Sequence, residues 1–139
     1  IGWGPLDLNL LAEEFGVTDK VLVFDKMSPE QLRFFYSKCH VFCLPSKSTI
    51  EEGEEGIPVV LMEAMASKML ILSTNSGSIC ELVDEIVVEQ GSVIDLKEGI
   101  EAAYKLIQNG GFDGQVSRDK VVTHYSVENV NRLHKHLYE

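Results

Sequence analysis

The sequence predicts an α/β fold with a parallel sheet flanked by helices. The apolar runs are short and continuous rather than alternating, which is typical of strands buried on both faces of a parallel sheet. Segments with helical spacing separate these runs, and strand–helix–strand alternation with short links also indicates a parallel sheet. The predicted strands are Val21–Phe24, Val41–Leu44, Met69–Leu72 and a weaker one at Ile86–Val88.

Helices are predicted from capping signals and from the spacing of apolar residues. Leu6–Phe15 is followed by Gly16, which fits the C′ position that ends many helices. Ser28-Pro29-Glu30-Gln31 predicts a capping box with proline at the first helical position, opening a helix that runs to about Lys38. Further helices are predicted over Ile57–Ala66, over Leu96–Gln108 and in two segments after Asp113, the last opened by Ser126 as N-cap.

Composition excludes several classes of protein. The 139 residues, 45% of them hydrophobic, predict one globular domain. A net charge of −10, from 12 Lys+Arg against 22 Asp+Glu, argues against binding to nucleic acid or to an anionic membrane surface. No stretch approaches the roughly 20 apolar residues of a transmembrane helix. Because the chain begins at Ile1 rather than Met, we expect it to be a fragment or an excised domain.

The cysteines argue against a disulfide framework and against zinc. Cys39, Cys43 and Cys80 are odd in number and form no CxxC motif. They lie in or next to apolar runs, so we expect them to pack in the interior. Reduced thiols point to the cytoplasm.

The stretch Leu44–Ala66 carries the chemistry that the sequence suggests. A buried strand is predicted to end near Pro45, a polar loop follows, and Gly56 precedes a helix that is apolar on nearly every side. One carboxylate, Glu63, stands in that helix. An unpaired buried carboxylate is costly, so Glu63 is expected to meet a partner or to face a cavity.

This loop is predicted to lie where ligands bind to open α/β sheets, at the carboxyl ends of the strands. A glycine at a helix N-terminus lets an anion approach free backbone N–H groups. Glu55 and Glu63 would be about 12 Å apart if helical rise applied throughout. Two carboxylates on either side of an anion-binding helix end suit a nucleoside diphosphate sugar, which has hydroxyls at both ends and phosphates between.

Glu55-Gly56-Ile57-Pro58 and Glu63-Ala64-Met65-Ala66 resemble the E-G-x-P…E-A-M-A signature of family 4 glycosyltransferases, most closely the bacterial exopolysaccharide transferases of the colanic-acid type. Further matching stretches lie in the same order along nearly all of the chain. They are Gly2-Trp3-Gly4-Pro5-Leu6, the positions Ser28, Glu30 and Leu32, the positions Thr74, Gly77-Ser78-Ile79 and Glu81, and Tyr125-Ser126-Val127-Glu128.

The resemblance implies the GT-B architecture, in which two Rossmann-like domains enclose the active site. Residues 1–139 would form the C-terminal, donor-binding domain, without its N-terminal strands and with no second domain in this chain. The implied reaction is retaining transfer of a hexosyl-type sugar from a UDP- or GDP-sugar to a saccharide or lipid-linked acceptor, with no metal and no other cofactor. The implied partner is the missing acceptor-binding domain, through which the enzyme could attach peripherally to a membrane.

The resemblance also implies roles for individual residues. Glu55 would be the catalytic carboxylate that holds the donor sugar, and Glu63 would bind the ribose hydroxyls. The backbone around Met27 would line the nucleobase pocket. The remaining donor-binding residues would be Gly56, Ile57 and Pro58, and the polar loop adds Lys47, which is within reach of a phosphate if it is not simply solvated.

Some positions depart from the family pattern, and other functions stay open. Asp25 and Cys80 stand where the family has glycine and proline, and the family's paired Arg and Lys would precede the first matched motif. The alternatives are a nucleotide-sugar epimerase of the same architecture and a non-catalytic nucleotide-binding or scaffolding module. The neighbouring Glu51, Glu52 and Glu54 are expected to be solvated, as a run of charges usually is. Together with Glu55 they could suggest a metal site, but they lack an ordered ligand spacing.

Overall fold

The computed structural model describes residues 6–48 and 56–138. The chain divides into two compact units, Ile1–Ser37 and Lys38–Glu139. The second unit contains the sheet and most of the helices, and each unit is considered separately below.

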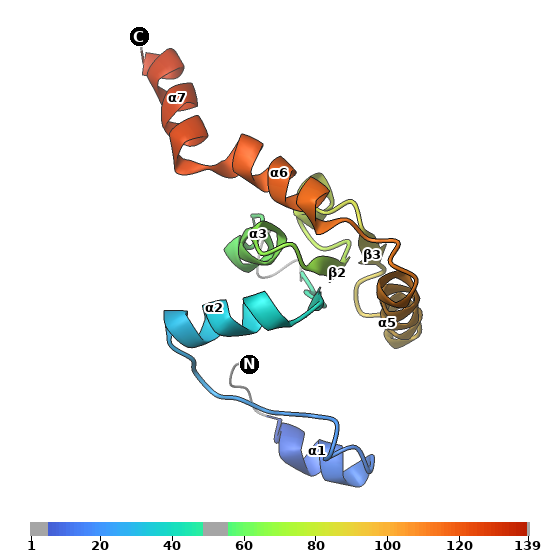
Figure 1. Ribbon diagram of the computed structural model, residues 1–139. Coiled ribbons are helices and arrows are strands. Elements are labelled where there is room, and N and C mark those ends of the chain that lie inside the picture. Colours follow the sequence, from blue (N-terminus) through green and yellow to red (C-terminus); the bar gives the residue numbers. More distant parts are fainter. Residues whose placement is uncertain (1–5, 49–55, 139) are drawn as a thin grey trace. The chain divides into compact units, whose positions relative to one another are not determined.

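The second unit is built on a three-stranded parallel sheet (Figure 1). Its strands are β1 (Val41–Leu44), β2 (Leu70–Thr74) and β3 (Ile86–Val88), in the order β1-β2-β3. Every residue of β2 is buried, because this strand has a neighbour on each side and helices on both faces. The parallel α/β fold expected from the sequence is therefore confirmed.

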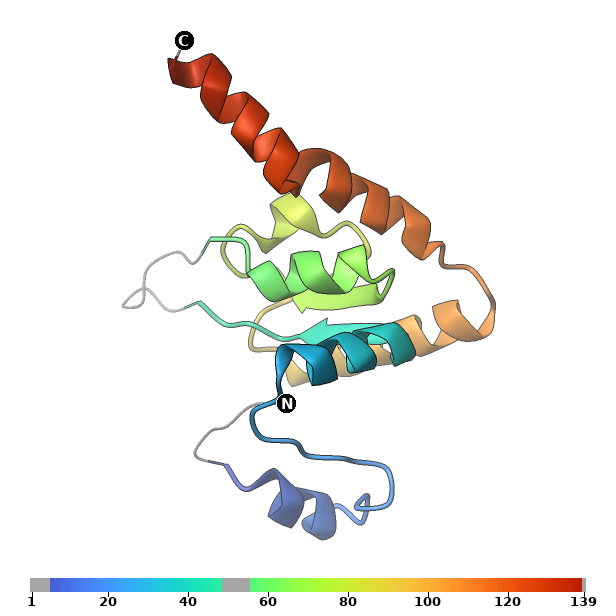
Figure 2. The same cartoon turned by 60° about the vertical axis from the view of Figure 1, so that its left-hand side comes forward.

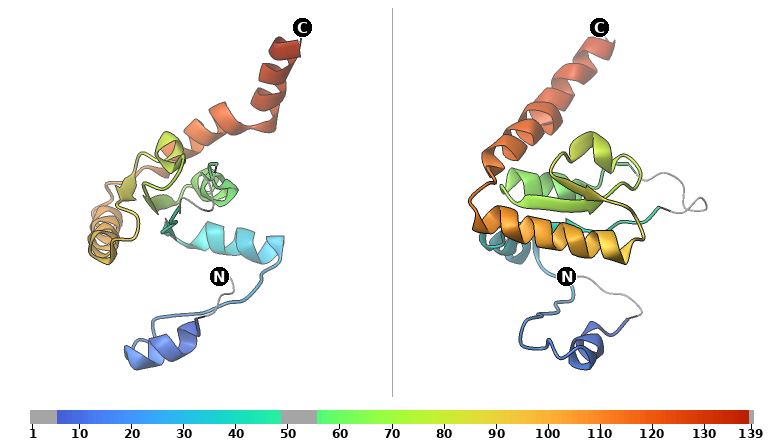
Figure 3. Two further views of the ribbon diagram at one scale, coloured as in Figure 1. Left: turned by 180° about the vertical axis from the view of Figure 1, so that it is seen from behind. Right: turned by 90° about the vertical axis from the view of Figure 1, so that its right-hand side faces the viewer.

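Helices cover both faces of this sheet (Figure 2 and Figure 3). α5 (Val93–Gln108) packs on β2 and β3, with the small residues Gly99 and Ala103 buried. α3 (Val59–Ala66) lies on the opposite face and contacts β1 and β2. The remaining helices of this unit are α4 (Ile79–Leu82), α6 (Gly114–Tyr125) and α7 (Val127–Tyr138).

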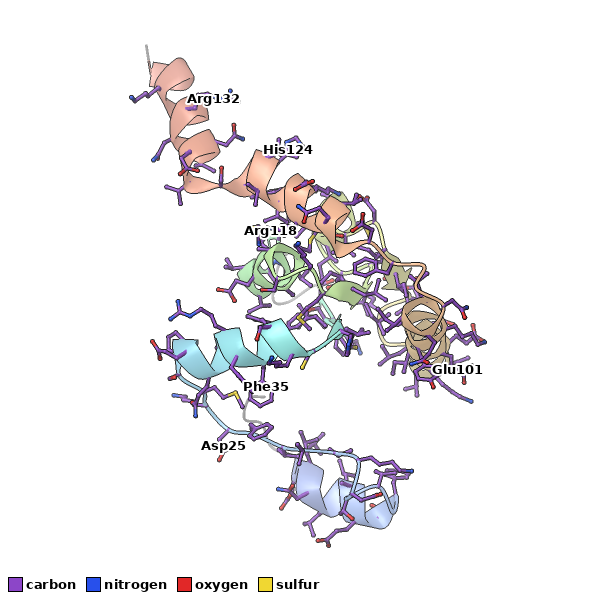
Figure 4. The ribbon with its side chains drawn as sticks, viewed as in Figure 1. Asp25, Phe35, Glu101, Arg118, His124 and Arg132 are labelled. Atoms are coloured by element: carbon purple, nitrogen blue, oxygen red, sulfur yellow. The ribbon has the colours of Figure 1, made fainter. Side chains whose placement is uncertain are left out.

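Side chains of α6 fix it to the segments beneath it. A guanidinium N–H of Arg118 donates to the carbonyl of Ala66 at the end of α3 (Figure 4). The ammonium of Lys120 donates to the Leu82 carbonyl at 2.7 Å and lies 2.6 Å from the Asp84 carboxylate. These contacts, together with the packing of α6 on α3, hold α6 over the face of the sheet that α3 covers.

The N-terminal unit contains α1 (Leu8–Glu14) and nearly all of α2 (Pro29–Lys38). The capping box predicted at the start of α2 is confirmed. The Gln31 N–H donates to Ser28 Oγ at 3.3 Å, and the Ser28 N–H donates to Gln31 Oε1 at 2.8 Å. Phe35 of α2 stacks at a tilt on Phe24, with ring centroids 5.1 Å apart (Figure 4).

Three predictions about these elements were wrong. Val21–Phe24 is not a strand, and its Phe24 ring packs on α2 within the N-terminal unit. α3 begins at Val59 rather than Ile57, since a residue that precedes proline disfavours helical backbone angles. α5 begins three residues earlier than expected, because the hydroxyl of Ser92 caps it by accepting a hydrogen bond from the Asp95 N–H.

The expected packing of the cysteines was also wrong. All three cysteines, Cys39, Cys43 and Cys80, have free thiols and are exposed as residues, although the thiol of Cys43 is partly buried. Cys43 belongs to β1, whose four residues are only partly covered. A continuous apolar run therefore marked a strand correctly at β1 but overstated its burial.

Candidate functional site

The ends of the three strands define the edge of the sheet at which the predicted site lies. β1 ends at Leu44, β2 at Thr74 and β3 at Val88. Because the strands are parallel, these carboxyl ends share one edge, and the chain from each of them leads into a helix. The predicted residues Lys47, Gly56, Ile57, Pro58 and Glu63 belong to the connection from β1 to α3 or to α3 itself.

The N-terminus of α3 has no side-chain cap. Its N-cap is Pro58, at φ −64° and ψ 127°, and no side-chain hydrogen bond caps the helix in the described part of the chain. The first N–H groups of a helix lack partners within the helix and carry its partial positive charge. An anion therefore finds favourable donors at this end of α3.

Gly56 lies in an open position before this helix. Gly56 was predicted to lie directly before the helix, but Ile57 and Pro58 lie between Gly56 and α3. Among the described residues, and apart from its chain neighbours, a Cβ atom built on Gly56 meets no atom within 4 Å, and the φ of Gly56 does not lie in the left-handed region. Neither backbone strain nor crowding in the described structure therefore requires glycine here.

Glu63 is exposed on α3 rather than buried. The helix buries one side only, through Leu61, Ala64 and Met65. Glu63 was expected to be a buried carboxylate because its helix is apolar on nearly every side; that was wrong, since even apolar Val59 is 66% exposed. Glu63 thus presents its carboxylate on the same short helix whose N-terminus lacks a side-chain cap.

Lys47 is exposed and passes beside the turn that follows β3. Its Cε atom lies 3.8 Å from the position that a Cβ atom on Gly91 would occupy. Gly91 has a φ of +76°, which side chains rarely tolerate. The structure therefore brings the stem of Lys47 from the β1 end to the β3 end of the edge.

Two predicted residues are not placed at this edge. Glu55 lies outside the described residues. Met27 is half-buried in the N-terminal unit, and its contact with a nucleobase stays a prediction. Ile57 and Pro58 are half-buried just before α3.

Two buried hydroxyls at the end of β2 hold the chain that leaves β1. Ser73 Oγ donates to the Leu44 carbonyl at 2.7 Å, and Thr74 Oγ1 donates to the Ser46 carbonyl at 2.5 Å. Both residues are nearly inaccessible, at 0% and 2% exposed. The sequence carried a signal for them, since two hydroxyl residues end an otherwise apolar run.

A second set of hydrogen bonds joins the chain after β1 to the turn after β3. Gln90 Oε1 accepts from the Ser48 N–H at 3.1 Å and from Ser48 Oγ at 3.2 Å. The Gln90 N–H donates to Asn75 Oδ1 at 2.9 Å. Gln90 and Ser48 are 42 positions apart, so no local pattern predicted this contact.

The larger described pocket lies away from these residues. It has a volume of about 620 Å³ and opens between α5 and the sheet. Its apolar lining includes Val41, Leu72 and Ala103. Cys43 also lines it, and burial raises the pKa of the Cys43 thiol. None of the predicted site residues that the structure describes lines this pocket.

The described residues contain neither a metal-ligand cluster nor a membrane-spanning helix. No three His, Cys, Asp or Glu side chains in residues 6–48 and 56–138 are grouped so that they could hold a metal ion. Within the same ranges, no helix has both the length and the apolar character needed to cross a membrane.

Two bacterial glycosyltransferases are similar to this chain over part of their length. AmsK, an amylovoran biosynthesis glycosyltransferase of Erwinia amylovora, is 32% identical over 89 residues, which are 63% of this chain and 22% of AmsK. WcaL of Salmonella typhimurium, provisionally named a colanic acid biosynthesis glycosyltransferase, is 27% identical over 141 aligned positions, covering 95% of this chain and 34% of WcaL. The chain thus spans about a third or less of these relatives.

Solved structures share the fold. A glycosyltransferase from Rickettsia africae ESF-5 matches 94% of this chain and 34% of its own, with a TM-score of 0.79 and 18% identity. Sucrose-phosphate synthase from Thermosynechococcus elongatus matches 94% of this chain and 33% of its own, with a TM-score of 0.74 and 20% identity. These neighbours have the GT-B fold, which the sequence predicted.

The family match covers most of the chain. Residues 2–110 match the family described as "Glycosyl transferases group 1". This range includes all three strands and every element at their carboxyl ends. The chain therefore belongs to the group 1 glycosyl transferases.

Proposed function

We propose that this chain is the donor-binding domain of a retaining glycosyltransferase that uses a UDP- or GDP-sugar. The observation that carries the proposal is the open approach to α3. Within the described part of the chain, Gly56 leaves free space before a helix N-terminus that no side chain caps, and Glu63 is exposed on the same helix. This combination offers donors for phosphate oxygens and acceptors for hydroxyl groups within one short segment.

The donor would lie along this segment with its diphosphate at the N-terminus of α3. Backbone N–H groups at a helix start bind phosphate through hydrogen bonds and through the helix dipole. A side chain at position 56 would occupy the space before the helix, so glycine there allows the closest approach of the backbone to the ligand. Lys47 lies at the same edge of the sheet, and its long side chain would bring a positive charge to the diphosphate.

The two carboxylates would bind opposite ends of the donor. Glu63 would accept hydrogen bonds from the two ribose hydroxyls, which suits a carboxylate because it has two acceptor oxygens. Glu55 would hold hydroxyls of the transferring sugar and so orient the reacting carbon. Met27 would border the nucleobase. The transfer would need no metal ion.

The rest of the enzyme would lie outside this chain. The group 1 relatives are about three times as long, which leaves room for an acceptor-binding domain. The acceptor would be a saccharide or a lipid-linked saccharide, in keeping with the polysaccharide relatives. The enzyme would act in the cytoplasm, with any attachment to a membrane made through the acceptor-binding domain.

Calorimetric titration of the 139-residue chain with UDP, GDP and ADP tests the proposal. We expect weak but measurable binding of at least one of them, because the N-terminus of α3 and Glu63 are present while the family's Arg/Lys pair is not. The matching nucleosides, which lack phosphate, serve as controls and should bind more weakly. Failure of all three nucleotides to bind at millimolar concentration would contradict the proposal.

Product analysis with a labelled nucleotide sugar separates the possible reactions. We expect the 139-residue chain alone to transfer no sugar, because the acceptor side of the active site would be absent. A preparation that also carries the acceptor domain should release nucleoside diphosphate and form a glycoside with retained anomeric configuration. An altered sugar still joined to its nucleotide would instead identify an epimerase.

A further inference from the structure

We propose that Gln90 is a positioning residue for the donor's diphosphate, acting through Ser48 on the backbone of Lys47. This inference rests on the proposed function, because it assigns Gln90 to the same donor site. The relevant contacts are those that tie the chain after β1 to the ends of β2 and β3. We call the set formed by Asn75, Gln90 and Ser48 the strand-end clasp.

The segment after β1 needs contacts from other strands because Pro45 interrupts the ladder. Proline has no N–H group to donate to a neighbouring strand. The segment is held through its carbonyl groups, since those of Leu44 and Ser46 accept hydrogen bonds from the buried hydroxyls of Ser73 and Thr74. Hydrogen bonds between buried groups fix direction as well as distance, so this end of the segment has one orientation.

Gln90 fixes the other end of the same segment. Its side-chain carbonyl accepts both the N–H and the hydroxyl of Ser48, at 3.1 and 3.2 Å. Gln90 is itself held by its N–H bond to Asn75 Oδ1. Asn75 is fixed in turn by its N–H, which donates to the Val88 carbonyl at 3.0 Å.

Lys47 lies between these two anchors. The carbonyl before it, that of Ser46, is held by Thr74, and the N–H after it, that of Ser48, is held by Gln90. Its Cε atom passes over the Gly91 position, next to Gln90 in the chain. The backbone of Lys47 is therefore fixed on both sides, while these contacts do not restrain its exposed side chain.

Such an arrangement would favour binding of an anion at the strand ends. A lysine side chain loses rotamer entropy when a ligand fixes it. A backbone that is already in place avoids the further cost of ordering the main chain when the diphosphate binds. Loss of the clasp should therefore lower affinity for a diphosphate without removing any group that touches it.

The test compares nucleoside diphosphate affinity in four variants of the 139-residue chain and in one control variant. Gln90→Met keeps the length of the side chain and removes both hydrogen bonds to Ser48. Ser48→Ala removes one of the two. Lys47→Met removes the charge, and the double variant Gln90→Met/Lys47→Met closes a thermodynamic cycle. Gln108→Met, the same substitution at an exposed position near the end of α5, is the control.

We expect Gln90→Met to weaken binding of UDP and GDP by about threefold to tenfold, the value of one or two neutral hydrogen bonds. Ser48→Ala should weaken it less, and Gln108→Met should leave it unchanged. In the Lys47→Met background, Gln90→Met should have little further effect on affinity, because Gln90 acts on the diphosphate only through the position of Lys47. Amide exchange of Ser48 should quicken in Gln90→Met, which reports the loss of the clasp directly.

Two results would overturn the proposal. One is unchanged nucleotide affinity in Gln90→Met. The other is an equal loss with and without Lys47, which would show that Gln90 acts on the fold alone. If the unmodified chain bound no nucleoside diphosphate, the proposed function itself would fail, and the role assigned to Gln90 would fail with it. The unmodified chain thus distinguishes the two failures.

Discussion

A Cβ atom added to Gly99 of α5 would lie 2.7 Å from Cδ1 of Leu72 in the middle of β2. It would also lie 2.9 Å from Cγ1 of Val88 on β3. Leu72 is fully buried, so its side chain has little room to move away. The helix therefore reaches the sheet at this point because glycine has no side chain.

Gly99→Ala should lower the free energy of unfolding of the chain. Overpacking a buried site costs about 1–3 kcal/mol, while alanine regains about 1 kcal/mol of helix propensity over glycine, so we expect a net loss of about 1 kcal/mol. Thermal or urea unfolding measures it, with Gly56→Ala as the matched control at a position with open space. A Gly99→Ala variant as stable as the unmodified chain would show that α5 can move away from β2.

Gly56→Ala separates a role in ligand binding from a role in stability. Because a Cβ atom there meets nothing within 4 Å, the melting temperature should stay unchanged. Affinity for UDP or GDP should fall, since the added methyl group occupies space where the backbone would approach the diphosphate. Unchanged affinity in titration calorimetry would mean that the donor does not pass over position 56.

Glu63→Gln should weaken nucleotide binding even for a nucleotide without sugar. A carboxylate accepts from two ribose hydroxyls with charge assistance, and an amide loses one acceptor and the charge. The expected loss is roughly 1–3 kcal/mol, the usual range for a hydrogen bond to a charged group. If this variant changed only the melting temperature, with affinity intact in the folded fraction, Glu63 would be a structural residue.

Glu55→Gln should act on turnover instead. Its proposed partner is the transferring sugar, so affinity for the nucleoside diphosphate should stay nearly constant. Turnover should fall in a preparation that carries both domains, since an interaction that orients the reacting group acts mainly on the transition state. Loss of nucleotide binding in Glu55→Gln but not in Glu63→Gln would reverse the assignment of the two ends of the donor.

The thiol of Cys43 should react with iodoacetamide more slowly near neutral pH than an ordinary cysteine thiol does. Burial raises the pKa of Cys43, and the thiolate rather than the thiol is the nucleophile. The rate should therefore rise through a midpoint above the value of about 8.5 for an ordinary cysteine. Peptide mapping after timed alkylation measures the rate, with N-acetylcysteine as the reference. Equal rates at pH 7.5 would contradict the expected shift.

Features set by neighbouring residues were predictable from the sequence. The capping box of α2 depends on Ser28 and Gln31 alone, and it was confirmed in residue and in register. The apolar runs at β1 and β3 were also placed correctly, because strands of a parallel sheet between helices have few polar positions even where they are only half-buried. The position of Gly56 at the carboxyl edge of the sheet follows from the same alternation of strands and helices.

Features set by distant residues were not predictable. Val21–Phe24 has the composition of a strand, but a strand also needs a neighbour with which to form its ladder. The exposure of Glu63 depends on which side of α3 the sheet covers, and the helix is apolar on both sides. The contact between Gln90 and Ser48 joins two loops that only the fold brings together.

The most direct test of the donor-binding assignment is a ¹H–¹⁵N chemical-shift titration of the 139-residue chain with UDP and GDP. Binding at the carboxyl edge should shift the amides of Lys47, Ser48, Gly56 and the first turn of α3, and leave α6 and the pocket beside α5 unchanged. Saturable shifts confined to that pocket, or the absence of any shift at millimolar nucleotide, would contradict the account.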